Sequence, residues 1–330
     1  MTKPPFTVSA KAVNLVAEIV EVLGAIRNIE SSFRRVELRK ENRIKTIQGS
    51  LAIENNSLSF DQITAILDGK RVLGAPHEIL EVKNAIQAYE LLLELNPYEE
   101  KDLLRAHSLM MNDLVSRSGK YRDSSVGVIA GKEVVHLAPP ADRVSYLMSD
   151  LFEWLKSSEE HPLIKSCVFH YEFEFIHPFS DGNGRMGRFW QTVILKEWKS
   201  IFAWIPVEVL VKENQIAYYE ALGSSDSDGS STAFIEFMLE LILRSIREIV
   251  ASEKMAPKVN KKVSLKVSEN QREILKAIKK NPFVSLEDLS EIVGIARKNV
   301  SANITKMKIA GLIRRVGARK SGYWEIVKRP

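Results

Sequence analysis

Twelve consecutive residues in the middle of the chain, from His177 to Arg188, combine a histidine, a carboxylate, a Gly-Asn-Gly turn and two arginines. Segments with helical apolar periodicity precede and follow this run, which predicts a short loop leading into the start of a helix. Backbone N–H groups at a helix start are unpaired and favour an anion. The run is therefore typical of a polyphosphate site with a base beside it.

The turn and the arginines of this run suit phosphate recognition. Gly182, Asn183 and Gly184 would present their N–H groups at the helix start, and glycine allows close approach of a phosphate to the backbone. Arg185 and Arg188 lie three residues apart and share a helix face. Both guanidinium groups could form paired hydrogen bonds with phosphate oxygens.

Asp181 and His177 add a metal ligand and a base. Asp181 is a hard oxygen ligand suited to a Mg²⁺ ion that also contacts phosphate, and His177 can accept a proton near neutral pH. His170, Glu174 and His177 also recur at helical spacing and could form a metal site instead. Because no H-E-x-x-H arrangement is present, we expect His170 and Glu174 to be buried, hydrogen-bonded supports of the loop.

The run resembles the signature of the Fic family, His-x-Phe-x-(Asp/Glu)-Gly-Asn-Gly-Arg-x-x-Arg, with every defined position matched. The similarity extends over about Pro97 to Val250 and includes Gly119 to Arg122 and His170 to Glu174. It implies a helical fold that transfers AMP from ATP to a Tyr, Thr or Ser hydroxyl of a target protein. ATP would be the substrate and Mg²⁺ the cofactor.

The resemblance also implies residue roles. The residue matching His177 deprotonates the target side chain in that family, and the one matching Asp181 holds Mg²⁺. Residues 182–184 match the anion hole, while Arg185 and Arg188 match the phosphate-binding arginines. Nothing in the sequence identifies the target protein.

Two further segments resemble parts of the family's substrate site. Tyr218 and Tyr219 resemble a pair near the adenine, although two tyrosines on one helix equally suit core packing. Residues 126–137 alternate as a β-hairpin does, and the hairpin resembles the flap that aligns a target segment by main-chain pairing. The flap residues would be Val134, Val135, His136 and Leu137.

A second specific string, SLAIEN, begins at Ser50. By itself it is a helix end, in which Ser50 and Glu54 lie one turn apart and Asn55 is a terminator. It also resembles the family's inhibitory helix, which implies that Glu54 pairs with Arg188 and holds ATP in a pose unsuited to in-line attack. In some relatives the matching glutamate assists AMP removal, so a bifunctional or de-AMPylating enzyme is the alternative.

The C-terminal region is strongly basic. From Lys254 onward the chain holds 19 basic and 6 acidic residues, a net charge of +13, whereas the rest has 28 basic and 36 acidic residues, a net of −8. Helices at 270–280, after Ser285 and at 297–310, then strands at 311–316 and 323–327, predict a winged helix-turn-helix domain. Groups suited to phosphates and base edges are Arg297, Lys298, Asn299, Ser301, Asn303, Arg319 and Lys320.

Three partners follow from these features: a target protein, DNA and a second copy of the chain. The winged helix could equally serve dimerisation or present protein targets. A DNA-binding regulator whose body only senses nucleotide is a further alternative, but the intact His177 and Asp181 argue against it because binding alone needs no base.

The remaining pattern predicts a mainly α protein with a β-hairpin and a C-terminal winged helix-turn-helix domain, and the resemblance implies that the body is a Fic-type helical bundle in which the hairpin is a flap. We expect an N-terminal helical region at 1–96, a catalytic core at 97–250, a linker at 251–266 and the winged helix at 267–330. No apolar run has the length of a membrane span, and the single Cys167 fits a reducing cytoplasm. Helices are expected at 13–23, 43–53, 79–95, 103–115, 143–155, 163–175, 188–198, 212–222 and 233–250, with a polar loop at 223–231.

Overall fold

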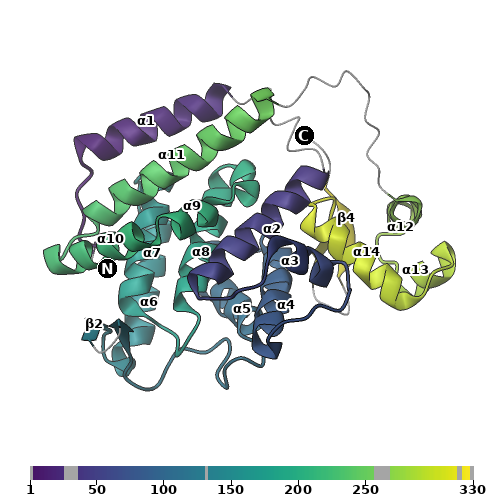
Figure 1. The fold of residues 1–330 in the computed structure, drawn as a ribbon, viewed down its shortest axis with the longest axis horizontal. Coiled ribbons are helices and arrows are strands. Elements are labelled where there is room, and N and C mark those ends of the chain that lie inside the picture. The colour runs from purple at the N-terminus through teal and green to yellow at the C-terminus, as the bar shows by residue number, and fades with distance from the viewer. Residues whose placement is uncertain (1–2, 26–35, 131–132, 256–267, 318–321, 328–330) are drawn as a thin grey trace.

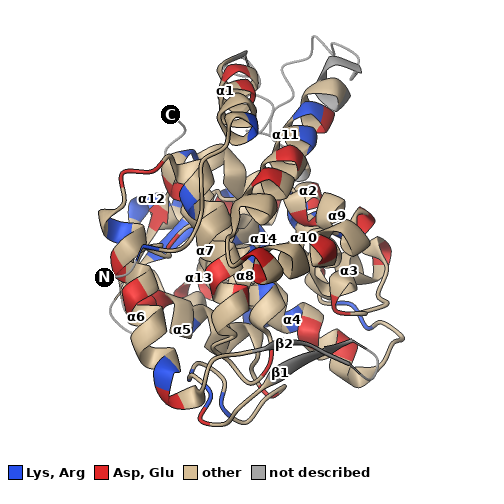
Figure 2. Ribbon diagram, turned by 90° about the vertical axis from the view of Figure 1, so that its left-hand side faces the viewer, with Lys and Arg blue, Asp and Glu red and all other residues tan. Residues whose placement is uncertain are grey.

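The computed structural model describes residues 3–25, 36–130, 133–255, 268–317 and 322–327. These residues form fourteen α-helices, one 3-10 helix and two small antiparallel sheets, which confirms the predicted mainly α class. The winged helix lies at the end of the molecule opposite the β-hairpin, and α1 and α11 extend together along one edge (Figures 1 and 2). None of the helices described is both long and apolar enough to cross a bilayer.

Eleven of the helices form the body, which holds residues 3–255. The body also contains the 3-10 helix Ser200–Trp204 and the hairpin of β1 (Gly127–Ala130) and β2 (Glu133–Leu137). Its helices are α1 (Ala10–Ala25), α2 (Val36–Ile53), α3 (Phe60–Leu67), α4 (Pro76–Leu91), α5 (Glu100–Met110), α6 (Ala141–Ser157), α7 (Pro162–Ile176), α8 (Asn183–Trp198), α9 (Val207–Glu213), α10 (Gln215–Asp228) and α11 (Thr232–Met255).

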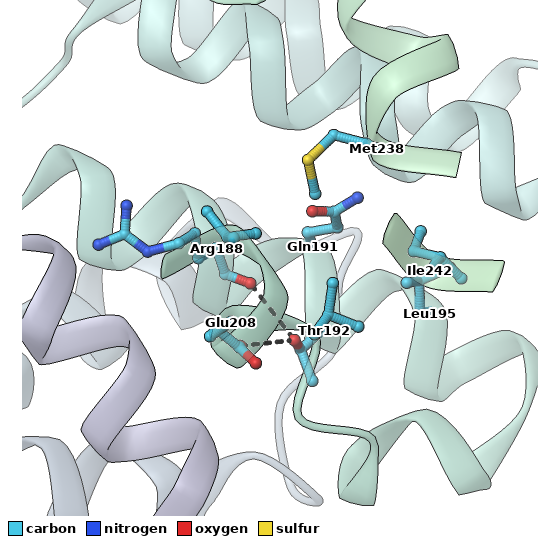
Figure 3. A pocket seen from close by; sticks show the side chains of 9 residues that line it. Arg188, Gln191, Thr192, Leu195, Glu208, Met238 and Ile242 are labelled. Carbon is cyan, nitrogen blue, oxygen red and sulfur yellow. Dashed lines mark hydrogen bonds between the residues drawn. The ribbon is translucent and has the colours of Figure 1, made fainter. Parts of the chain in front are cut away.

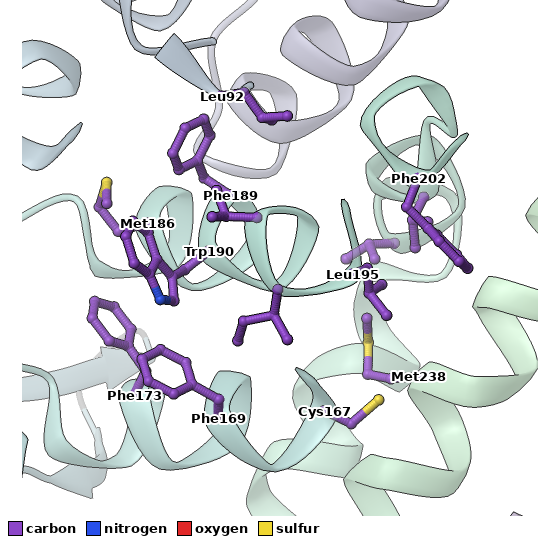
Figure 4. Packing of buried hydrophobic residues seen from close by; sticks show 14 of the residues in the cluster. Leu92, Cys167, Phe169, Phe173, Met186, Phe189, Trp190, Leu195, Phe202 and Met238 are labelled. Carbon is purple, nitrogen blue, oxygen red and sulfur yellow. The ribbon is translucent and has the colours of Figure 1, made fainter. Parts of the chain in front are cut away.

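The centre of the body is the packing of α7 against α8, the two helices that flank the twelve-residue run. Phe169 and Phe173 of α7 face Met186 and Trp190 of α8, and all four side chains are fully buried (Figure 4). Apolar groups of this size supply most of the free energy of burial. The run is therefore a short connection between two helices whose positions are set by the core.

Three predictions about the body need correction. The residues 223–231 are largely helical, because α10 continues to Asp228 and ends at Gly229 in the left-handed conformation. The Ser225 hydroxyl accepts the N–H of Phe234 and is buried, so this polar stretch is stabilised by tertiary contacts. Helix α11 continues to Met255, into the expected linker, whose other residues lie outside the described ranges. Helix α3 was not predicted, although Ser59 and Gln62 form a capping box at its start.

Helix α2 packs closely on the start of α9 because residue 49 is glycine. A Cβ atom at Gly49 would lie 2.9 Å from the backbone carbon of Glu208 and 2.9 Å from the backbone nitrogen of Val209. Backbone atoms cannot move aside as a flexible side chain can. The absence of a side chain at Gly49 thus sets how near α2 can approach the centre of the body.

The winged helix-turn-helix prediction is confirmed. Its core contains Leu289, Val300, Met307 and Trp324, and the Trp324 indole donates to the Val284 carbonyl at 3.1 Å. The predicted wing residues Arg319 and Lys320 lie outside the described residues. The elements are α12 (Glu269–Lys280), α13 (Leu286–Val293), α14 (Arg297–Ile309), β3 (Ile313–Val316) and β4 (Tyr323–Ile326).

Replacing Gly49 by alanine should destabilise the protein. We expect G49A to lower the free energy of unfolding by about 1–3 kcal/mol relative to wild type, as overpacking against rigid neighbours does. Gly24 of α1 is a matched control, since nothing lies within 4 Å of a Cβ placed there. Urea unfolding followed by circular dichroism measures both variants, and equal midpoints for G49A and G24A would contradict the packing argument.

Candidate active site

His177 ends α7 in an unusual backbone conformation. Its φ of 49° is left-handed, a region that non-glycine residues rarely adopt. This turn stops the helix and directs the chain into the loop, while Nδ1 of the ring lies 3.3 Å from the carbonyl oxygen of Glu174. Strain of this kind persists where surrounding contacts hold the residue in place.

Arg122 supplies those contacts. Its Nε donates to the carbonyl oxygen of His177 at 2.8 Å, and its Nη2 donates to the carbonyls of Ile176 and Pro139. Its own N–H donates to the Pro178 carbonyl at 2.9 Å. Arg122 therefore ties the His177 loop to the chain segments before and after the β-hairpin. The sequence contained Arg122 within the string from Gly119, but nothing there indicated this role.

The side chain of Asn183 closes the loop from the other end. Its Oδ1 accepts the N–H of Phe179 and its Nδ2 donates to the Phe179 carbonyl, both at 2.9 Å. Gly182 precedes it with φ 83°, and a Cβ there would lie 2.6 Å from the sulfur of Met111. The Asn183 side chain is thus a loop support, and the helix α8 begins at Asn183 with the N–H groups of residues 182–184 at its start.

Asp181 is the exposed carboxylate of the loop. Its side chain is 61% exposed, and its Oδ1 accepts the Gly182 N–H at 2.6 Å. Beneath it, His107 Nε2 donates to the Asp181 carbonyl at 3.1 Å, while Nδ1 accepts the N–H of Gly119. Burial lowers the pKa of His107 to about 4, so the ring is neutral and its two roles are fixed. Sequence reasoning did not identify His107.

Arg185 is buried and already paired. Its Nη1 lies 3.1 Å from Glu81 of α4, and its Nη2 lies 3.4 Å from Asp181. The second oxygen of Glu81 accepts from the Asn56 side chain at 2.8 Å. Glu81 of α4 therefore connects Arg185 of α8 to the segment that follows α2. Because these residues lie far apart in the sequence, no local pattern indicated the contact.

Arg188 makes the contact that the SLAIEN string predicted. Its Nη2 lies 2.6 Å from Glu54 Oε1, and it donates from Nε to the Ser50 hydroxyl at 3.3 Å and from Nη2 to the Ser50 carbonyl at 3.2 Å. Burial by itself would lower the pKa of Arg188, but the charge and hydrogen bond of Glu54, together with Tyr218 and Glu174, raise the pKa above its usual value. The structure thus brings residues 50, 54 and 188 together.

The carboxylate of Glu54 also lies over the start of α8. A Cβ at Gly184 would be 2.6 Å from Glu54 Oε1 and 3.0 Å from Arg188 Nη1. A negative group therefore already occupies the space between the glycine turn and Arg188, where an anion would be favoured. A phosphate and the Glu54 carboxylate could not share this space.

Behind Arg188 lies a small pocket between α8, α9 and α11, and the guanidinium extends away from it (Figure 3). Glu208 lines this pocket and is 2% exposed, within 3.4 Å of the Thr192 hydroxyl. Burial raises the pKa of Glu208 to about 7, although Arg188 and Arg43 act in the opposite direction. This carboxyl supports the inner side of α8 and was not singled out from the sequence.

His170 is the buried, hydrogen-bonded support of α7 that was expected, whereas Glu174 is partly exposed and its Oε1 has no hydrogen-bond partner among the described residues. His170 Nδ1 is 2.8 Å from Gln191 Oε1, and its Nε2 is 3.1 Å from the Tyr218 hydroxyl and 3.6 Å from Glu174. The described residues contain no group of three or more side chains arranged as metal ligands. Tyr218 is 1% exposed and part of this core, whereas Tyr219 is 50% exposed.

The hairpin predicted as a flap is present. Strands β1 and β2 pair antiparallel, with an irregularity between Val128 and Ile129. Val134, Val135, His136 and Leu137 all lie in β2, but their side chains are outside what the structure describes. The base of the hairpin is fixed to the His177 loop through Arg122.

Comparisons with known proteins agree with this geometry. A model of the Fic/DOC family matches residues 97–195, and one of winged helix-turn-helix DNA-binding domains matches residues 267–314. The protein adenylyltransferases Fic of Culex quinquefasciatus and Aedes aegypti are 27% and 28% identical over 237 and 238 residues. Each alignment covers 68% of this chain and 45% of the relative, so the chain spans about half the length of these curated relatives.

Solved structures extend the similarity over the whole chain. Fic-1 (aa134–508) from C. elegans has a TM-score of 0.56 at 22% identity, over 74% of this chain and 72% of that one, and shares the fold. A Fic family protein from Desulfovibrio desulfuricans G20 has a TM-score of 0.74 and is 42% identical, covering 100% of this chain and 99% of that one. The chain described here therefore belongs to the Fic family and carries a C-terminal winged helix-turn-helix domain.

Proposed function

We propose that this protein is an autoinhibited protein adenylyltransferase that transfers AMP from ATP to a Tyr, Thr or Ser hydroxyl of a target protein. One observation carries the proposal: the run from His177 to Arg188 gathers helix-start N–H groups and two arginines at the start of α8, and its last arginine pairs with Glu54. The curated relatives bear the name protein adenylyltransferase, which supports the same chemistry.

The proposed reaction is an in-line displacement at the α-phosphate of ATP. His177 accepts the proton of the target hydroxyl, the hydroxyl oxygen bonds to the α-phosphorus, and the bond to the leaving pyrophosphate breaks. The N–H groups of residues 182–184, with Arg185 and Arg188, hold the phosphates. Asp181 suits Mg²⁺ because it is an exposed carboxylate beside this anion site, and a bound Mg²⁺ would neutralise phosphate charge.

Autoinhibition follows from competition for one guanidinium. Glu54 and the γ-phosphate both require Arg188, and Glu54 is covalently part of the chain, so its effective concentration is high. Productive binding of ATP then needs the segment after α2 to withdraw. Regulation would lie within one chain, and the β2 strand would align an extended segment of the target by main-chain pairing.

Removing the proposed base should abolish AMP transfer. We expect H177A to lose about 10²–10⁴-fold or more in labelling by α-³²P-ATP, because general base catalysis contributes that much. Tyr146 is a matched control, since it is an exposed aromatic on α6 and Y146A should label like wild type. Labelling by H177A at the wild-type rate would exclude His177 as the base.

Changes at the two ends of the Arg188–Glu54 ion pair should have opposite effects. E54G should raise labelling on the order of tenfold or more, because ATP no longer competes with Glu54 for Arg188. A tenfold rise corresponds to a competing interaction of about 1.4 kcal/mol. R188A should lower it, because the same arginine is needed for the γ-phosphate. The control is E213G, which removes an exposed glutamate at the end of α9. Unchanged labelling of E54G would contradict autoinhibition.

DNA binding by the winged helix is a second candidate function. The observation that favours it is the exposed start of α14, where Arg297, Lys298, Asn299 and Ser301 face solvent in a domain matching DNA-binding modules. Affinity for a 20-base-pair duplex, measured by fluorescence anisotropy, should fall steeply between about 50 and 200 mM salt if several phosphates are contacted. If the affinity for the duplex did not change with salt, the winged helix would not contact several phosphates, and a protein partner would be the better interpretation.

A further inference from the structure

The winged helix is docked on the body through the second half of α14. Ile309, at the end of this helix, is buried in the core of the body and not in that of the winged helix. The chain then turns at Gly311, where a Cβ would lie 2.8 Å from Trp204 and 3.1 Å from Arg39 Nη1. The two domains therefore share a close interface centred on the end of α14, near the start of α2 (Figure 1).

The body side of this interface is acidic. Asp68, which caps the end of α3, pairs with Lys306 of α14 at 3.3 Å and with Lys40 of α2 at 3.1 Å. Glu94, just after α4, lies 3.9 Å from Lys308 and accepts the backbone N–H of Arg315 at 3.3 Å. These carboxylates satisfy basic and N–H groups of the winged helix.

Glu90 of α4 also faces the winged helix, where Thr305 and Lys308 favour its charged form. Burial raises the pKa of Glu90 to about 7, against the opposing effects of Lys308 and Thr305. Part of the interface is therefore formed at a desolvation cost. We name Asp68, Glu90 and Glu94 the acidic docking surface.

The docked groups and the exposed groups of α14 all lie outside the face that packs in the domain's own core, which holds Val300, Ile304 and Met307. Lys298, Ser301, Thr305 and Lys308 recur at three- and four-residue spacing and form one row. Lys306 lies in a second row, two turns after the exposed Asn299. Together the two rows form the outer face of α14. The first half of the outer face is exposed, and the second half is covered by the acidic docking surface.

A DNA duplex could not use this face while the domain is docked. Helix α14 is about 20 Å long, so its two halves lie within the width of one duplex. A recognition helix in the major groove brings phosphates along both of its sides. The carboxylates of the docking surface would then lie against DNA phosphates, and the bulk of α4 would occupy the same space.

We propose that duplex DNA and the acidic docking surface compete for the outer face of α14, so that DNA binding releases the winged helix from the body. This rests on the proposed DNA binding by the domain. Release also removes a contact of α2, because Arg39 Nη1 donates to the Ala310 carbonyl at 3.2 Å and to that of Gly311 at 3.4 Å. Helix α2 continues from Arg39 to Ser50, which contacts Arg188.

Carbodiimide cross-linking of the full chain tests this competition. The reagent converts a Lys–Asp or Lys–Glu ion pair into an amide, which peptide mass spectrometry quantifies. We expect the Lys306–Asp68 cross-link to fall at least about fivefold when a 20-base-pair duplex saturates the protein. The Lys11–Glu240 pair, 2.7 Å apart between α1 and α11, is the internal control and should not change. An unchanged Lys306–Asp68 yield at saturation would overturn the proposal.

Weakening the docking surface should have the reverse effect on DNA. Because the docked fraction reduces apparent affinity, E94Q should bind the duplex about fivefold more tightly by fluorescence anisotropy. E240Q, outside the interface, should bind like wild type. Equal affinities for E94Q and wild type would overturn the competition, and no binding by any variant would overturn both the DNA proposal and this inference.

AMP-transfer labelling with and without DNA tests whether release of the winged helix affects the site through α2. Duplex DNA should raise AMP transfer by wild type but leave E54G unchanged, since that variant lacks the residue that α2 positions. A wild type that labels equally with and without saturating DNA would overturn the connection through α2. If no variant labels, the proposed transferase function fails, while the cross-linking and affinity results still decide the competition.

Discussion

A single ion pair between Arg188 and Glu54 holds together the parts of this molecule that matter for its proposed chemistry. It joins the helix that begins the anion site to the segment after α2, across 134 residues of sequence. The Arg188 side chain is buried, and the Ser50 hydroxyl and carbonyl accept two further hydrogen bonds from its guanidinium. A buried charge left without its partner is costly, so Arg188 requires either Glu54 or another anion.

This requirement links resting state and activity. The same guanidinium that stabilises the position of α2 is the group a nucleotide would need, so each occupant excludes the other. The glycines make the exchange possible: Gly184 leaves room for a carboxylate or a phosphate, and Gly49 allows α2 to approach closely enough for Glu54 to reach. Under the proposed function, regulation would depend on which anion pairs with Arg188 at the start of α8.

The loop that would perform the chemistry is rigid for a separate reason. Arg122 holds the carbonyls at the end of α7, Asn183 holds Phe179, and neutral His107 holds the Asp181 carbonyl. These contacts come from three different parts of the chain and keep His177 in its left-handed conformation. A base held in this way loses little conformational freedom when substrate binds.

The sequence determined those features that depend on local chemistry and spacing. Three local motifs could be interpreted from the sequence alone: the run from His177 to Arg188, the helix end at Ser50 and the basic helix-turn-helix pattern. Side chains a few residues apart on one helix or loop lie close together regardless of the rest of the fold. These motifs were enough to predict the family, the mainly α class and the winged helix, all of which are confirmed. Polar residues 223–231 were mistaken for a loop because Ser225 and its neighbours find their partners only in the folded protein.

Only the tertiary structure decided how distant segments meet. Arg122, His107, Glu81 and Glu208 have no local pattern that marks them, since their partners lie far away in sequence. The assignment of Tyr218 to the core, the distance from Arg188 to Glu54 and the docking of α14 on Asp68 and Glu94 are likewise results of packing. Periodicity shows which side of a helix is apolar, but the identity of the surface that covers it depends on the arrangement of all the helices at once.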